Sequence, residues 1–282
     1  MNQIDFNSIS NYHSWPKTLL DNVKLSVKHK TIDQVIREFG DEKWTQIYTL
    51  LKNKPGINLN QLEELINKEE KLNVSVIRGN FFETSNSKIN AIYIEILKKT
   101  LLKYSNQYQT IVEIGAGYGS KILQIASCDE FINNKFVAGE LTQQGQGLIK
   151  KLASNMDLNM NVGYCDILNG DYSELKIPDN SIIFSFYSAH YVSDFKKSLY
   201  KKILKLNPSI IIHFEPIYEA LSSNNIYELM CRKYIKINDY NTNLLQTIKL
   251  LEADKLLSFT IQKNVLGSNP FLPISIIECK PN

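Results

Sequence analysis

Cysteine is scarce in this sequence, and the few cysteines are far apart. The four are Cys128, Cys165, Cys231 and Cys279. No two of them have the C-x-x-C spacing of zinc sites and redox motifs, so we expect neither a metal site nor a disulfide framework. Two of them, Cys165 and Cys279, lie in apolar stretches, where a thiol packs as a small hydrophobic side chain.

Long hydrophobic runs and charge of one sign are also lacking. No apolar run approaches the ~20 residues that a membrane span needs, and the first residues lack the basic and apolar parts of a secretory signal. Lys and Arg number 32 against 29 Asp and Glu, a formal net charge of +3. Basic residues occur as short pairs such as Lys196-Lys197 and not as a stripe. We therefore expect a cytoplasmic protein without a membrane partner, and nucleic acid is a disfavoured partner.

Apolar material for a core is ample, because 43% of the 282 residues are hydrophobic. Up to about residue 105, apolar residues recur at helical spacing. The expected helices are Lys17–Lys30, Thr31–Phe39, Glu42–Lys52, Asn58–Lys68 and Ser87–Tyr104. The stretch from Arg78 to Asn86 is expected to be irregular. These features predict a helical N-terminal region over residues 1–86 and a main domain over residues 87–282.

From Gln109 onward, strand patterns alternate with helix patterns, as in a parallel sheet with helical crossovers. The expected strands are Thr110–Ile114, Phe136–Glu140, Asn161–Cys165, Ser181–Phe186 and Ile210–Phe214. The expected helices are Ser120–Ala126, Gln144–Met156, Phe195–Leu206 and Ile217–Ile237. Two last strands, Leu257–Val265 and Ile274–Cys279, are close in sequence and must pair antiparallel. The prediction is an α/β doubly wound sheet, mostly parallel, with a C-terminal antiparallel hairpin.

The most informative run follows the first of these strands. Glycines stand at alternate positions, Gly115, Gly117 and Gly119, and a helix follows them. Glycine permits positive φ and has no Cβ, so a ligand can lie against its backbone. A dinucleotide-binding turn needs G-x-G-x-x-G, but the sixth position here is Ser120. A simple tight turn between strand and helix is the alternative interpretation.

The G-x-G-x-G spacing behind an acid, Glu113, resembles the first motif of the class I S-adenosylmethionine-dependent methyltransferases. Further strand ends agree with this resemblance. Glu140 ends the second strand, Asp166 follows the third, and the run from Ser181 to His190 is similar to the family's fourth-strand motif. All of these positions lie at the carboxyl edge of the sheet, where open α/β sheets bind ligands. The resemblance covers roughly residues 100 to 282.

The resemblance implies a Rossmann-like fold, S-adenosyl-L-methionine as cofactor, a cap or lid role for the helices of residues 1–86, and a set of cofactor-binding residues. These are Glu113, Gly115, Ala116, Gly117 and Gly119 at the methionine part, Glu140 at the ribose, Asp166 at the adenine amino group, and Leu141 and Ile167 beside the adenine ring. Arg78 is a candidate ligand for the cofactor carboxylate or for an anionic substrate. Leu141 and Ile167 are equally compatible with a core position, and Arg78 with a surface one.

Catalysis of methyl transfer relies mainly on alignment and desolvation, and a base matters only where the acceptor must lose a proton early. His190, beyond the fourth strand, is the first candidate for a base or a substrate contact, and Tyr187 for a wall of the methyl site. Pro216 is expected to end the fifth strand and to leave Glu215 at the same edge, where it holds a substrate or caps the next helix. His213 fits a buried, hydrogen-bonded histidine. For His190, the alternative interpretation is a histidine at a helix start without a functional role.

The sequence gives weaker evidence about the substrate class than about the cofactor. A helical cap and a near-neutral charge favour methylation of oxygen or nitrogen on a small molecule or a peptide. A macromolecular substrate, either protein or RNA, and a non-catalytic relative that only binds the cofactor are the alternatives. The oligomeric state stays open, and a homodimer is compatible with the sequence.

Overall fold

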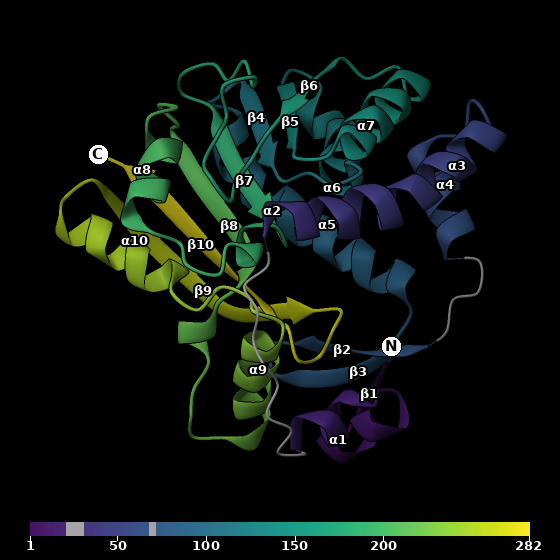
Figure 1. Cartoon of the computed structure of the whole chain (residues 1–282), viewed down its shortest axis with the longest axis vertical. Helices are drawn as coiled ribbons and strands as arrows, with labels where there is room; N and C mark the ends of the chain where they lie inside the picture. The colour runs from purple at the N-terminus through teal and green to yellow at the C-terminus, as the bar shows by residue number, and fades with distance from the viewer. Residues whose placement is uncertain (21–30, 68–71) are drawn as a thin grey trace.

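The structure, a computed structural model, describes residues 1–20, 31–67 and 72–282. Two of the expected helices fall partly outside these ranges: Lys17–Lys30 beyond Leu20, and Asn58–Lys68 at its last residue. Figure 1 shows one large sheet with helices packed on both of its faces. Within the described residues, ten strands form this sheet in the order β1-β3-β2-β9-β10-β8-β7-β4-β5-β6.

The central part of the sheet is parallel, as the sequence predicts. Its strands are β4 (Thr110–Ile114), β5 (Lys135–Glu140), β6 (Met160–Tyr164), β7 (Ile182–Phe186) and β8 (Ile210–Pro216). Strand β10 (Ile274–Pro281) pairs antiparallel with β8 and with β9 (Leu257–Gly267). The predicted mostly parallel sheet with a C-terminal antiparallel hairpin is therefore confirmed.

The sheet has a hydrophobic core on each face. Along β4, Ile111 packs in one core, whereas Val112 and Ile114 pack in the other, because successive side chains of a strand point to opposite faces. The helices on the first face are α5 (Asn86–Ser105), α6 (Ser120–Ala126) and α7 (Gln143–Asn155). Those on the second face are α8 (Lys197–Leu204) and α10 (Leu244–Ala253). Both faces are covered, as in a doubly wound fold.

The N-terminal region adds strands to the sheet, which the sequence did not predict. Strands β1 (Asn2–Ile4), β2 (Asn73–Ile77) and β3 (Asn80–Thr84) extend the edge at β9. The stretch expected to be irregular is therefore mostly strand β3. Its hairpin turn consists of Arg78 and Gly79, both at positive φ. Such a turn needs φ above zero at both central residues, and Arg-Gly is not a common signal for it.

The helices of the N-terminal region pack on α6 and α7. They are α2 (Ile32–Val35), a wider helical stretch (Ile36–Trp44), α3 (Thr45–Asn53) and α4 (Leu59–Ile66). Leu51, Leu59 and Leu62 of these helices share a core with Leu123 and Leu148. Their place, above the carboxyl ends of β4 and β5, suits the cap that the sequence predicts (Figure 1). The division of the chain at residue 86 stays a prediction.

Two boundaries in the second half differ from expectation. Strand β8 runs through Pro216, which pairs with Ile274, so proline does not end this strand. The predicted helix Ile217–Ile237 is instead a short turn of helix at Tyr218–Ala220 and α9 (Ile226–Ile237), joined by a polar loop. Shorter elements are α1 (Trp15–Leu20) and single helical turns at Phe6–Asn11, Asp129–Phe131 and Ala189–Tyr191.

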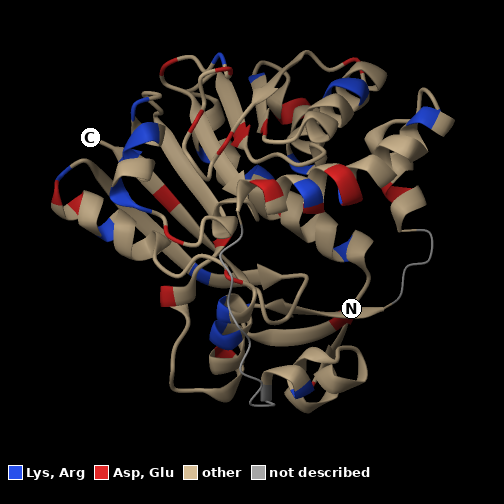
Figure 2. Ribbon diagram, in the orientation of Figure 1, with Lys and Arg blue, Asp and Glu red and all other residues tan. Residues whose placement is uncertain are grey.

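Charges are distributed without a dominant sign over the described elements. Figure 2 shows Lys and Arg interspersed with Asp and Glu on the helices. None of the described helices is long and apolar enough to cross a membrane. Nowhere in residues 1–20, 31–67 and 72–282 do three or more His, Cys, Asp or Glu side chains gather as metal ligands would.

Candidate functional site

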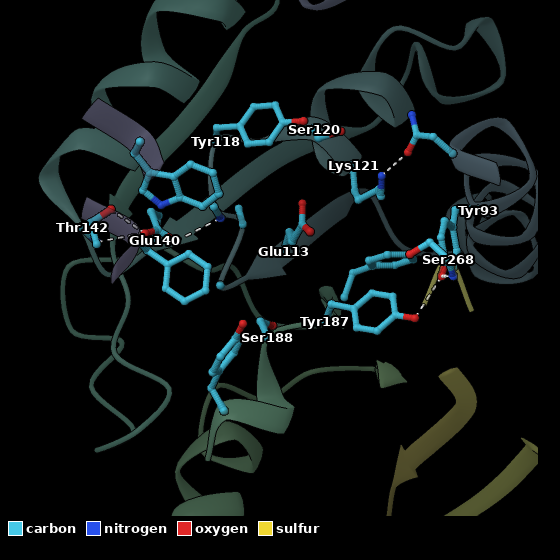
Figure 3. Close-up of a pocket in the computed structure, with 18 of the residues that line it drawn as sticks. Tyr93, Glu113, Tyr118, Ser120, Lys121, Glu140, Thr142, Tyr187, Ser188 and Ser268 are labelled. Atoms are coloured by element: carbon cyan, nitrogen blue, oxygen red, sulfur yellow. Dashed lines mark hydrogen bonds between the residues drawn. The ribbon is translucent and has the colours of Figure 1, made fainter. Parts of the chain in front are cut away.

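A cavity of about 820 Å³ lies at the carboxyl edge of β4, β5 and β7, beneath the cap helices. Its volume falls within the range of small-molecule sites. Of the predicted site residues, eight line this cavity: Glu113, Gly115, Ala116, Gly117, Glu140, Leu141, Ile167 and Tyr187. Figure 3 shows several of them facing the same space. The structure thus brings these eight residues together around one cavity, and their binding of a cofactor stays a prediction.

The floor of the cavity is the glycine turn after β4. The backbone N–H groups of Gly115 and Ala116 both donate to the carbonyl of Gly139, at 2.9 Å each. Gly117 has φ +60, and a Cβ there would lie 3.0 Å from the ring of Trp44 in the cap. Gly117 thus presents bare peptide beneath an aromatic ring, which any side chain would obstruct.

Gly119 has a packing role instead. It precedes the first residue of α6 with φ +85, and a Cβ on it would lie 2.9 Å from Ile149 and 3.0 Å from Leu123. Gly119 does not line the cavity. The third glycine of the motif therefore lets α6 pack on its neighbours, and its predicted contact with the cofactor is not supported.

Glu140 fixes the end of β5 to the glycine turn. Its Oε2 accepts a hydrogen bond from Gly117 N–H at 3.0 Å, and its Oε1 accepts from Thr142 N–H at 3.0 Å and Thr142 Oγ1 at 2.7 Å. Burial raises the pKa of Glu140, while the bonds from Thr142 and Gly117 oppose this shift. The carboxylate is buried and still lines the cavity.

Glu113 lies at the centre of the site in Figure 3. It accepts a hydrogen bond from the backbone N–H of Ile122 at 3.0 Å. Burial raises the pKa of Glu113 to about 8, and the positive charge of Lys121 opposes this shift. Near neutral pH this side chain therefore holds or releases a proton readily.

Lys121, in the first turn of α6, is a site residue that the sequence reasoning missed. Its Nζ donates to Asn90 Oδ1 and lies 5.3 Å from the ring centroid of Phe186 and 5.9 Å from that of Tyr93. Burial lowers the pKa of Lys121. The sequence carries one usable signal: a lysine in the first turn of a helix opposes the helix dipole, and so needs another reason to be there.

Aromatic residues of the cap close the other side of the cavity and were also missed. Trp44 packs with Phe39 and Tyr118 at ring-centroid distances of 5.7 and 5.4 Å, and Phe39 packs with Tyr191 at 5.2 Å. The buried Trp44 Nε1 has no hydrogen-bond partner among the described residues. A buried N–H usually has a partner, so this unsatisfied group is an unusual feature of the packing around Trp44.

Tyr187 lines the cavity as predicted, at the end of β7. Its backbone has φ +48, and its hydroxyl donates to the carbonyl of Leu272 at 2.8 Å and lies 2.9 Å from the hydroxyl of Tyr93. Burial raises the pKa of Tyr187 well above its ordinary value. The side chain therefore stays protonated, and because its O–H is used by Leu272, it acts as a wall of the cavity.

His190 and Glu215 lie outside the lining of the cavity, contrary to the expectation that they meet a substrate. Glu215 is fully buried and accepts hydrogen bonds from the backbone N–H groups of Ser188, Ala189 and His190, at 3.0, 2.9 and 3.2 Å. His190 Nδ1 lies 3.1 Å from the same carboxylate. Through these bonds, Glu215 and His190 hold the loop after β7 in place. Glu215 does not cap the following helix either.

Asp166 and Arg78 also lie outside the lining of the cavity. The carboxylate of Asp166 accepts hydrogen bonds from the backbone N–H and the Nδ2 of Asn169, both at 3.0 Å, and so closes the loop after β6. It does not line the cavity. Arg78 is exposed at the β2–β3 turn and lines a second cavity of about 750 Å³. The predicted adenine and carboxylate contacts of these residues are therefore not supported by their positions.

His213 is a buried, hydrogen-bonded residue, as the sequence favours. Its Nδ1 lies 2.9 Å from Ser185 Oγ and its Nε2 lies 3.0 Å from the hydroxyl of Tyr200. Burial lowers the pKa of His213 to about 4, so the ring is neutral near pH 7.

No protein-family model matches the sequence, and a search of curated proteins finds no relative. Solved structures do match. Magnesium protoporphyrin IX methyltransferase from Synechocystis PCC 6803 with bound S-adenosylhomocysteine (SAH) has a TM-score of 0.53 and 11% identity, over 89% of this chain and 100% of that one. The same enzyme with bound S-adenosylmethionine has a TM-score of 0.50 and 9% identity, over 91% and 100%. An O-methyltransferase from Bacillus cereus has a TM-score of 0.48 and 16% identity, over 85% and 99%.

The likeness to the Synechocystis enzyme establishes the fold of the chain. It extends over nearly all of the chain and over the whole of the solved structure. The Rossmann-like fold predicted from the glycine turn and the alternating strands and helices is therefore confirmed.

Proposed function

We propose that this protein is an S-adenosylmethionine-dependent methyltransferase that methylates an oxygen or nitrogen atom of a small molecule or a peptide. One observation carries the proposal: the buried carboxylate of Glu140 lines a cavity whose floor, at Gly117, is bare peptide. A carboxylate at this strand end is suited to accept hydrogen bonds from both hydroxyls of a ribose.

Other features of the cavity fit the same cofactor. Leu141 and Ile167 present apolar side chains beside Glu140, where an adenine ring would lie. The ring of Trp44 packs close to Gly117 and forms an apolar wall of the cavity. The solved structures with the same fold hold S-adenosylmethionine or SAH, which supports the choice of this cofactor.

The chemistry needs little from the protein beyond positioning. When bound, S-adenosylmethionine supplies a methyl group on a positively charged sulfur, which is a good leaving group. Phe39 and Trp44 cover the cavity and exclude water, while Glu140 and the glycine turn fix the direction of the ligand. Alignment and desolvation of this kind account for large rate enhancements. Tyr187 stays protonated, and its side chain forms part of the cavity wall.

The acceptor is proposed to be a small molecule or a peptide because the cap covers part of the cavity. Its outer part, between α4 and the start of α5, is lined by Asn60, Glu64, Asn67 and Asn86. These side chains offer both donors and acceptors of hydrogen bonds. A polar acceptor of limited size fits this part better than a nucleic acid, for which Figure 2 shows no basic stripe among the described residues.

Titration calorimetry with SAH tests the proposal. We expect binding tighter than about 1 mM to the wild-type protein and none of comparable strength for a dinucleotide such as NADH. Gly117→Ala should abolish SAH binding, because its Cβ would lie 3.0 Å from the ring of Trp44 and would displace this wall of the cavity. Gly79→Ala is the matched control, since Gly79 also has positive φ but lies in open space. Absence of SAH binding to the wild type would refute the proposal.

A further inference from the structure

Lys121 is a half-buried lysine of the cavity wall whose ammonium group does not use all of its hydrogen-bond donors. It has three N–H bonds to donate, and the partner recorded for it among the described residues is Asn90 Oδ1. Its other close neighbours are the faces of Phe186 and Tyr93. No carboxylate of the described residues lies within the 4.0 Å of an ion pair with it. A charge that is partly removed from water and forms no ion pair is unfavourable, so Lys121, on the cavity wall, is suited to an anion that enters the cavity.

The position of Lys121 is fixed by its surroundings. Asn90 Nδ2 donates to Glu63 Oε2 at 3.3 Å, which turns Asn90 Oδ1 toward the ammonium group. Glu63 in turn accepts from Ser120 Oγ at 2.6 Å and from Gln124 Nε2 at 3.1 Å. Glu63 comes from the cap, Asn90 from α5 and Ser120 from α6. Three elements thus hold the ammonium group at one place on the wall of the cavity.

Two acidic side chains and one basic side chain follow one another along the cavity. In Figure 3, Glu113 lies between Glu140 and Lys121, which stand on opposite sides of it. Glu113 and Glu63 are the acidic groups whose charges act on Lys121. A ligand with a ribose at Glu140 would therefore meet a carboxyl group first and an ammonium group beyond it. An α-amino acid carries the complementary pair of charges, an ammonium group and a carboxylate.

We infer that Lys121 binds the carboxylate at the amino-acid end of the cofactor, and so makes the site select S-adenosylmethionine over nucleosides that lack this carboxylate. The inference rests on the proposed function. It replaces the role expected of Arg78, which lies at the other cavity. Glu113, nearer the centre of the site, is the group suited to face the cofactor's ammonium group.

The test compares two ligands that differ only in this carboxylate: S-adenosylmethionine and decarboxylated S-adenosylmethionine. Affinities are measured by calorimetry for the wild type and for Lys121→Met, which has a side chain of similar length without charge. We expect Lys121→Met to bind S-adenosylmethionine about ten- to a hundredfold more weakly, the usual loss for a hydrogen bond to a charged group. Its affinity for the decarboxylated ligand should change less than about twofold.

The control is Lys99→Met, because Lys99 is an exposed lysine of α5 outside the lining of the cavity. It should change neither affinity. Binding of the decarboxylated ligand by Lys121→Met also demonstrates that the variant is folded. The inference is overturned if Lys121→Met binds S-adenosylmethionine as tightly as the wild type, or if it loses both ligands equally, while the proposed function would stand. If the wild type binds neither ligand, the proposed function itself fails.

Discussion

Two buried glutamates at the same edge of the sheet have different roles. Glu140 ends β5 and Glu215 lies near the end of β8, and both accept hydrogen bonds from backbone N–H groups. Glu140 nevertheless lines the cavity, whereas Glu215 is fully buried away from it. Their sequence contexts are alike, since each acid follows a run of strand residues.

The difference lies in the loop that is next to each carboxylate. After β5, the chain passes through Thr142 directly into α7, so nothing covers the cavity side of Glu140. After β7, the chain turns at Tyr187, and residues 188–190 lie over Glu215 with their N–H groups toward it. A carboxylate at a strand end is thus available to a ligand only where the adjacent loop leaves it uncovered.

The largest expected effect is on stability, at Glu215. Glu215→Ala would leave three buried backbone N–H groups without an acceptor, and unsatisfied groups of this kind are costly. We expect the free energy of unfolding to fall by about 3–5 kcal/mol, as for the loss of one partner in a buried charged network. Urea unfolding measures this change. A loss below about 1 kcal/mol would mean that Glu215 does not clamp the loop.

Glu113 is a third buried glutamate, and it should make the free energy of unfolding depend on pH. With its pKa raised to about 8, the folded protein keeps a proton that the unfolded chain releases near pH 4.5. The unfolding free energy should therefore fall as pH rises from about 5 to about 8. Relative to Glu113→Gln the fall should amount to a few kcal/mol, since one pKa unit corresponds to about 1.4 kcal/mol.

Urea unfolding of both proteins across this pH range is the measurement. The glutamine keeps an acceptor for the N–H of Ile122, so the difference between the two curves reports the ionisation of Glu113. Parallel curves would show that Glu113 is ionised throughout.

A substitution of Glu140 should mainly affect the affinity for SAH. Glu140→Ala should weaken SAH binding by about 1–3 kcal/mol, because charge-assisted hydrogen bonds to the ribose are lost. Its stability should fall less than that of Glu215→Ala, since water in the cavity can solvate the freed N–H groups. Calorimetry measures the affinity. An unchanged affinity would remove the ribose role of Glu140 and with it the contrast with Glu215.

The smallest effect is expected at His190. His190→Phe keeps an aromatic ring among Tyr187, Tyr191 and Tyr240 and removes one hydrogen bond to Glu215. We expect a loss of about 1 kcal/mol in stability and an SAH affinity within about twofold of the wild type. A tenfold weaker affinity would instead place His190 in the binding site.

The sequence was sufficient for features that depend on local pattern. The parallel strands follow from apolar runs between turn signals, and the cavity floor follows from glycines that stand at Gly115 and Gly117. Glu140 was also placed correctly on the cavity, because its position depends only on where β5 ends.

Features that depend on packing between distant segments were not predictable in this way. Asn90 and Trp44 reach the cavity only because α5 and the cap pack over the sheet edge. His190 carries no local sign that the loop after β7 turns it toward Glu215. Arg78 was misplaced because its positive-φ turn, which completes the β2–β3 hairpin, has no strong sequence signal.

A crystal structure of the protein with SAH is the most direct test of the contrast between the two glutamates. We expect the ribose hydroxyls within hydrogen-bond distance of Glu140, the amino-acid part over Gly117, and Glu215 still bonded to the loop after β7. A nucleoside bound at another place, or a ribose that Glu140 does not contact, would contradict the account.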